Sequence, residues 1–139
     1  MTKHPLTIAL ENADLPGVAG ELSPGVVFHS PILATSADEV RRFDVVVTII
    51  QTAIACYGLP RHVAEFQNPD GRYIVTFDGT VEGNLLQVAM LVTENAAGKV
   101  ESLRFHMRPW PVVKLFREYM QRHIPRTVVS AAIWALPNQ

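Results

Sequence analysis

Residues 71–111, GRYIVTFDGTVEGNLLQVAMLVTENAAGKVESLRFHMRPWP, decide the fold of this chain. Three strand-like runs follow one another here, over residues 72–81, 85–93 and 100–108, and turn signals separate them. The first and third runs alternate apolar and polar residues, which is the pattern of a half-buried strand. The middle run is more continuously apolar, as a strand covered on both faces would be. The stretch therefore predicts three consecutive strands joined by tight turns.

The alternation also predicts which side chains share a face of the sheet. The buried face is expected to carry only apolar side chains, namely Val75, Phe77, Val88, Met90, Leu103, Phe105 and Met107. The opposite face carries the polar alternates, namely Thr76, Asp78, Arg104, His106 and Arg108. Any ionisable group that works on the buried side must therefore come from outside this stretch.

Helices are expected before and after these strands along the sequence. Helical spacing predicts short helices over residues 5–13 and 14–22, the second capped by Asp14, and residues 26–29 read as a brief strand. Ser36 and Glu39 form a capping box ahead of a long apolar stripe that ends at Gly58, which predicts the central helix.

A last helix is predicted after Pro111, up to Pro125. The apolar tail over residues 127–136 is compatible with a strand or a helix. This order of elements, with no alternation of strand and helix and no repeat of fixed period, is typical of an α+β protein.

Composition narrows the class of protein. A chain of 139 residues is normally one domain, and it has 48% hydrophobic residues, 18% charged residues and a formal net charge of -1. This balance excludes a disordered chain and disfavours nucleic acid as a partner. The lone Cys56 cannot form an internal disulfide, which favours a reducing, cytoplasmic location. No apolar run approaches the roughly 20 residues that span a bilayer, so we expect no membrane association.

Motifs for cofactors and metals are missing from the sequence. The five histidines show no pair at metal-ligand spacing, and a single cysteine excludes a Cys-x-x-Cys motif. The sequence has no phosphate-binding glycine loop, no dinucleotide fingerprint and no nucleophile elbow. We therefore predict no metal and no cofactor.

Three stretches resemble the nuclear transport factor 2-like superfamily and, within it, the SnoaL-like domains of bacteria. They are residues 22–31 (LSPGVVFHSP), 75–79 (VTFDG) and 98–109 (GKVESLRFHMRP). The resemblance implies a cone-shaped α+β fold, in which a curved mixed or antiparallel sheet wraps around a pocket covered by N-terminal helices and one long helix. It implies a single domain over residues 1–122. The apolar extension over residues 123–139 is expected to pack on the domain or across a homodimer, because packing explains an apolar segment of this kind most easily.

The resemblance also implies a small, mainly apolar ligand inside the cone. The expected contacts are Phe28, Ser30, Tyr57, Val75, Phe77, Val88, Met90, Leu103, Phe105, Met107 and Trp110. Members of the superfamily include ketosteroid isomerases, polyketide cyclases, epoxide hydrolases, dehydratases and domains without known activity, so the fold alone does not assign a reaction.

Candidate catalytic residues follow from a comparison with ketosteroid isomerase, which uses a carboxylate base, a tyrosine and a protonated aspartic acid. Where that family has its base before a proline, this chain has His29-Ser30-Pro31, and Met90 stands where the acid would be. His29 is then the first candidate for proton transfer, because imidazole titrates near neutral pH. Asp78 and His106 form a second candidate pair, provided that the face they share meets the pocket.

Three functions remain open from the sequence. The chain could be an isomerase, cyclase or hydratase that uses His29, a non-catalytic ligand-binding domain, or a dimeric interaction domain that works through its sheet surface and its C-terminal tail. The missing carboxylates favour the second and third.

Overall fold

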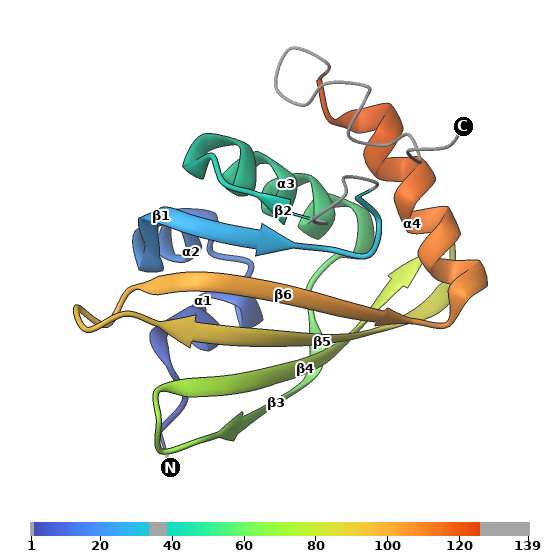
Figure 1. The fold of residues 1–139 in the computed structure, drawn as a ribbon. Coiled ribbons are helices and arrows are strands. Elements are labelled where there is room, and N and C mark those ends of the chain that lie inside the picture. The colour runs from blue at the N-terminus through green and yellow to red at the C-terminus, as the bar shows by residue number, and fades with distance from the viewer. Residues whose placement is uncertain (1, 34–38, 126–139) are drawn as a thin grey trace.

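The computed structural model of the chain describes residues 2–33 and 39–125. The helices are α1 (Pro5–Glu11), α2 (Leu15–Glu21), α3 (Phe43–Tyr57) and α4 (Trp110–His123). The strands are β1 (Leu22–His29), β2 (Glu39–Val40), β3 (Arg61–Gln67), β4 (Arg72–Val81), β5 (Asn84–Glu94) and β6 (Val100–Arg108). Within the described ranges they form one sheet in the order β2-β1-β6-β5-β4-β3 (Figure 1). β1 runs parallel to β6 and all other neighbours are antiparallel, so the predicted α+β class with a mixed sheet is confirmed.

The three strands predicted from residues 71–111 are β4, β5 and β6. β4 and β5 are joined by a two-residue turn at Glu82 and Gly83, whose φ angles of 50° and 78° match the primed turns that suit a hairpin. The turn before β6 contains Gly98 at φ 78°, a conformation in which a side chain is disfavoured. The turn residues therefore fix the register of this part of the sheet.

Two predicted boundaries are wrong. The central helix begins at Phe43, and Glu39 and Val40 instead form the short strand β2, paired with His29 and Phe28 of β1. Backbone hydrogen bonds with β1 pair the N–H and C=O groups of these two residues, and this pairing outweighs the local capping pattern. Ser36, the other half of the predicted capping box, lies outside the described residues. β1 begins at Leu22, and its register with β6 shifts between Leu22 and Val27.

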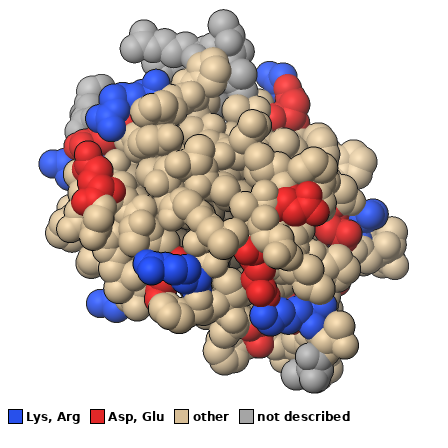
Figure 2. Space-filling model, turned by 180° about the vertical axis from the view of Figure 1, so that it is seen from behind, with Lys and Arg blue, Asp and Glu red and all other residues tan. Residues whose placement is uncertain are grey.

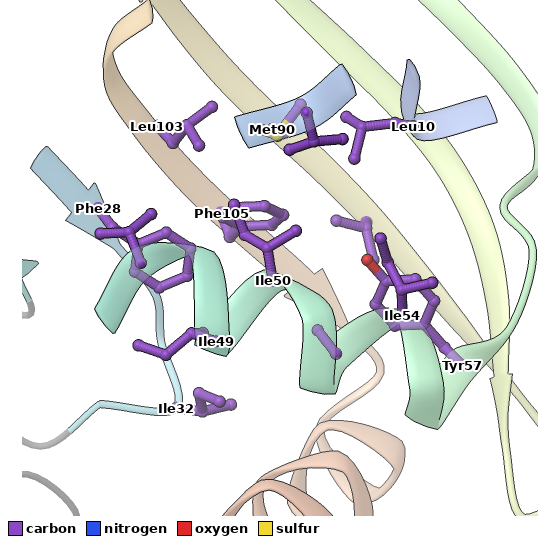
Figure 3. Packing of buried hydrophobic residues seen from close by; sticks show 14 of the residues in the cluster. Leu10, Phe28, Ile32, Ile49, Ile50, Ile54, Tyr57, Met90, Leu103 and Phe105 are labelled. Atoms are coloured by element: carbon purple, nitrogen blue, oxygen red, sulfur yellow. The ribbon is translucent and has the colours of Figure 1, made fainter. Parts of the chain in front are cut away.

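The hydrophobic core lies between the helices and one face of the sheet, here called the inner face (Figure 3). Six of the seven side chains assigned to this face by alternation are at most 9% exposed, and Met107 is half-buried. The six are Val75, Phe77, Val88, Met90, Leu103 and Phe105. The predicted separation of faces is confirmed.

Aromatic side chains join the helices to the sheet. The ring of Tyr57, near the end of α3, lies 5.5 Å from the ring of Phe77 and 5.9 Å from that of Phe116 on α4, measured between centroids. Gly79 makes this approach possible, because a Cβ at that position would stand 2.7 Å from the Cβ of Tyr57. The close contact between α3 and β4 therefore depends on a glycine in the strand.

Candidate functional site

Among the described residues, a small cavity lies between α1, α3, α4 and the inner face. Its volume is about 20 Å³. It is lined by Leu10, Phe28, Ser30, Ile32, Ile49, Ile50, Ala53, Tyr57, Phe105, Met107, Phe116 and Met120. Ligand pockets usually measure roughly 300–1,000 Å³, whereas a cavity of this size holds about one water molecule. In residues 2–33 and 39–125, this space is thus almost filled by the protein's own side chains.

The predicted ligand contacts divide into three groups. Phe28, Ser30, Tyr57, Phe105 and Met107 do line the cavity. The five other core residues, Val75, Phe77, Val88, Met90 and Leu103, are buried but do not line it. Trp110, at the first position of α4, is 66% exposed and is not part of the cavity wall.

Two hydroxyl groups are the polar features of the cavity. Ser30 is buried, and its Oγ accepts a hydrogen bond from the backbone N–H of Ile32 at 3.4 Å. Burial, with a smaller contribution from the neighbouring Cys56, raises the pKa of Tyr57 well above its usual value. Tyr57 is therefore a neutral phenol at ordinary pH, and it can donate or accept a hydrogen bond but cannot serve as a base.

His29 is not part of the cavity wall. It is the last residue of β1, where it pairs with Arg104 of β6 and Glu39 of β2 through the backbone, and its side chain is half-buried. Its neighbours Phe28 and Ser30 line the cavity, and successive side chains of a strand point to opposite faces. His29 therefore does not line this cavity, and its role in proton transfer stays a prediction.

The outer face of the sheet carries a hollow that brings Asp78 and His106 together. This hollow, here called the His106 hollow, has a volume of about 360 Å³. It is lined by His62, Thr76, Phe77, Asp78, Gln87, Val88, Ala89, His106, Met107 and Arg108. The condition under which Asp78 and His106 were predicted to act, a shared face that meets the interior, is not met, but the two residues do border one open space.

Sequence reasoning missed His62, which lies beside Asp78. Its Nδ1 is 2.9 Å from Oδ2 of Asp78. The pairs Arg61–Asp78 and Ala64–Thr76 are separated by three residues along β3 and two along β4, so β3 contains a bulge here, and His62 has φ 55°. Nothing in the composition of β3 marks this bulge, and only the pairing of β3 with β4 reveals it.

A second hollow, here called the Phe66 hollow, lies on the same face toward the turn between β3 and β4. Its volume is about 570 Å³. It is lined by Phe66, Gln67, Asn68, Arg72, Tyr73, Ile74, Leu91, Val92, Thr93, Ser102 and Arg104. Phe66, Ile74 and Leu91 are 60%, 38% and 40% exposed, which is high for large apolar side chains.

A polar cluster around Glu65 ties the N-terminal segment to the inner face. Glu65 accepts two hydrogen bonds from His4, one from its backbone N–H and one from its ring Nδ1, each at 3.0 Å. It also accepts hydrogen bonds from Thr7 Oγ1 and from Gln67 Nε2. Burial acts to raise the pKa of Glu65, but the hydrogen bonds from Gln67, Thr7 and His4 outweigh it and lower this pKa to about 2. The carboxylate is therefore charged at any ordinary pH and is fully engaged in holding α1 to β3.

Other chemistry finds little support in the part of the chain that the structure describes. Residues 2–33 and 39–125 contain no group of three His, Cys, Asp or Glu side chains that could hold a metal ion. Burial, with a smaller contribution from Glu82 and against an opposing one from Arg122, raises the pKa of the Cys56 thiol to about 11, which leaves little reactive thiolate. On the side opposite to that of Figure 1, positive and negative side chains are interspersed and no broad basic patch is seen (Figure 2). Among the described helices, none is long and apolar enough to cross a bilayer.

Known structures share this architecture. An uncharacterized protein conserved in bacteria with a cystatin-like fold, from Silicibacter pomeroyi, superposes with a TM-score of 0.72 at 17% identity, over 91% of this chain and 85% of that chain. A steroid delta-isomerase from Pseudomonas aeruginosa gives a TM-score of 0.70 at 21% identity, over 88% of each chain. An NTF2-like protein of unknown function from Cytophaga hutchinsonii gives 0.59 at 14% identity, over 78% of this chain and 88% of that chain.

Sequence comparisons add no closer relation. No protein-family model matches the chain, and no curated protein matches it. The resemblance to the nuclear transport factor 2-like superfamily is confirmed at the level of the fold, which does not carry a reaction with it.

Proposed function

We propose that this nuclear transport factor 2-like domain is a homodimeric interaction domain that works through the outer face of its sheet. One contrast carries the proposal. The cavity enclosed by the described residues measures about 20 Å³, while the outer face exposes a row of large apolar side chains beside a hollow of about 570 Å³. Exposed apolar rows rimmed by polar residues are typical of protein association surfaces.

The apolar row, here called the apolar ridge, consists of Phe66, Ile74 and Leu91 and is continuous across three strands. Phe66 of β3 is the direct partner of Ile74 of β4, which in turn is the direct partner of Leu91 of β5. Polar residues border the ridge toward the turns, including Arg72 and Thr93. The ridge is therefore a compact apolar surface with a polar margin.

A second copy of the chain is the partner that suits the apolar ridge. In a two-fold dimer the same patch is used on both subunits, so an axis through the ridge would place Phe66, Ile74 and Leu91 of each copy against those of the other. The contact would remove three apolar side chains per subunit from water, with the polar residues of the Phe66 hollow as a rim. The ridge needs no second, complementary surface elsewhere on the molecule.

Binding of an apolar ligand inside the domain and catalysis by His29 both require a geometry that differs from the observed one. An apolar ligand inside the domain would require the cavity to grow from about 20 Å³ to at least roughly 300 Å³. Acid–base catalysis by His29 would require its imidazole to reach a substrate from a strand position opposite to the cavity-lining Phe28. Both functions stay predictions from the sequence.

The oligomeric state tests the proposal. We expect sedimentation equilibrium to give a dimer for the wild type at protomer concentrations of tens of micromolar, and Leu91→Arg to raise the dimer Kd at least about tenfold, because the two-fold axis sets the new charges near one another. Leu59→Arg is the matched control, since Leu59 is 59% exposed in the loop after α3 and belongs neither to the apolar ridge nor to the lining of the Phe66 hollow. A wild type that is monomeric at about 100 μM, or equal effects of the two substitutions, would contradict the proposal.

A further inference from the structure

We propose that the His106 hollow is a binding site for a small organic carboxylate. The hollow lies on the outer face beside the apolar ridge, toward the end of β6 that leads into Pro109. It is independent of the proposed dimer contact, because none of Phe66, Ile74 and Leu91 lines it.

The floor of the hollow is low because small residues form it. Thr76 of β4 and Ala89 of β5 are direct partners, and Ala89 is also the direct partner of His106 on β6. Larger side chains border this row, namely His106 and Arg108 of β6, Asp78 of β4 and His62 of β3, and Gln87 of β5 lies between Asp78 and Arg108. Since neighbouring strands lie about 4.8 Å apart, the walls on β4 and β6 stand roughly 10 Å apart. That width accepts a single six-membered ring or a chain of a few carbon atoms.

The wall on β6 is the cationic one. Arg108 and His106 both border the hollow, and one guanidinium nitrogen of Arg108, Nη1, donates to Oε1 of Gln87 at 2.7 Å. This bond orients the guanidinium and leaves its other N–H groups for an acceptor, which makes it suited to a planar carboxylate. His106 adds a ring N–H from the same strand, two residues away.

The opposite wall sets the polarity of the ligand. Asp78 Oδ2 is 2.9 Å from His62 Nδ1, and both residues border the hollow. A second anionic group on the ligand would meet the Asp78 carboxylate, whereas a hydroxyl would find an acceptor there or on the imidazole. The site therefore suits one carboxylate at the Arg108 end and a neutral polar group at the Asp78 end.

A matched pair of probes tests the charge requirement. We expect 4-hydroxybenzoate to bind with a Kd in the millimolar range or below, and 4-hydroxybenzamide, which has the same shape without the charge, to bind at least about tenfold more weakly. In ¹H–¹⁵N spectra of the wild type, the shift changes caused by 4-hydroxybenzoate should centre on the amides of Gln87, Ala89 and His106. The proposal would be overturned if 4-hydroxybenzoate caused no saturable chemical-shift change up to about 10 mM, or if 4-hydroxybenzamide bound equally well.

A matched pair of variants tests the location. Arg108→Gln removes the charge that the proposal assigns to the ligand, and we expect it to weaken binding of 4-hydroxybenzoate at least about tenfold. Arg104→Gln makes the same substitution at a position four residues earlier on the same face, in the Phe66 hollow, and should change the Kd less than about twofold. Retained spectral dispersion shows that each variant is folded, and equal losses in both variants would refute the assignment to the His106 hollow.

Discussion

Replacing Tyr73 by phenylalanine is expected to stabilise the protein. Tyr73 is 2% exposed, and its hydroxyl is a buried polar atom without a hydrogen-bond partner among the described residues. The ring stacks on the ring of His4 with 3.7 Å between centroids, and His4 is in turn held by Glu65. Burial, followed by the nearby carboxylates of Glu94, Glu65 and Glu21, raises the pKa of Tyr73, so the buried group is the neutral phenol.

The size of the effect depends on the cost of the unpaired hydroxyl. A buried polar group without a partner costs about 1–3 kcal/mol, and Tyr73→Phe removes that group while it keeps the ring, its packing and its stacking on His4. We therefore expect the free energy of unfolding to rise by about 1 kcal/mol or more. With a urea m-value of about 2 kcal/mol/M, this shifts the unfolding midpoint upward by about 0.5 M.

Urea unfolding at one fixed protomer concentration is the suitable assay, because dimer formation would make the midpoint depend on concentration. Tyr119→Phe is the control: Tyr119 is half-buried on α4, so loss of its hydroxyl should change stability by less than about 0.5 kcal/mol. A Tyr73→Phe protein that is less stable than the wild type by about 1 kcal/mol would refute the reasoning, since it would show that the hydroxyl has a partner, such as an enclosed water.

Single contacts elsewhere in the fold lead to three more predictions. Gly79→Ala should destabilise the fold by about 1–3 kcal/mol in urea unfolding, because its Cβ would stand 2.7 Å from that of Tyr57, whereas Gly25→Ala, with open space around it, should have little effect. Glu65 has a folded-state pKa of about 2 against an ordinary 4.5, so its contribution to the free energy of unfolding is complete above pH 4.5 and is lost as the pH falls toward 2. Glu65→Gln should reduce this loss when unfolding is measured over a series of pH values, and a pH profile equal to that of the wild type would contradict the prediction. With its pKa raised to about 11, Cys56 should react slowly with iodoacetamide at pH 8 in the native protein and quickly in urea, and equal rates would show a thiol that is not shielded.

The sequence predicts the sheet well because local and global preferences agree there. In β4 and β6 the alternation of side chains, the turn residues and the final pairing all indicate the same faces and nearly the same boundaries. The prediction that β5 is covered on both faces is wrong, because Leu85 and Leu91 on its outer side are 46% and 40% exposed. The predicted start of α3 is wrong because Glu39 carries a strong local capping pattern, while its backbone pairs with His29, a contact ten residues away that no local window contains. Local signals decide an element only where no distant partner competes for its backbone.

The candidate site is harder to predict than the sheet. Alternation correctly places Asp78 and His106 on one face, but it cannot show that the inner face is filled rather than hollow. Cavity volume depends on how side chains from α3, α4 and the sheet interdigitate, and a few rotamers decide between a pocket and a packed core. The pairing of His62 with Asp78 depends on a bulge in β3, which adds one residue and leaves no mark in composition.

Alternate residues of each strand belong to the inner and the outer face of the sheet, and this division favours function on the outer face. The inward residues of β4 to β6 pack into a core whose cavity, within the described residues, measures about 20 Å³, so substitutions on the inner face act mainly on packing. The residues between them point outward and are not constrained by packing in the core. They include the exposed apolar ridge and the ionisable residues Asp78, His106 and Arg108. A filled cone thus leaves its outer surface as the part of the scaffold on which association and ligand binding can be built without loss of the fold.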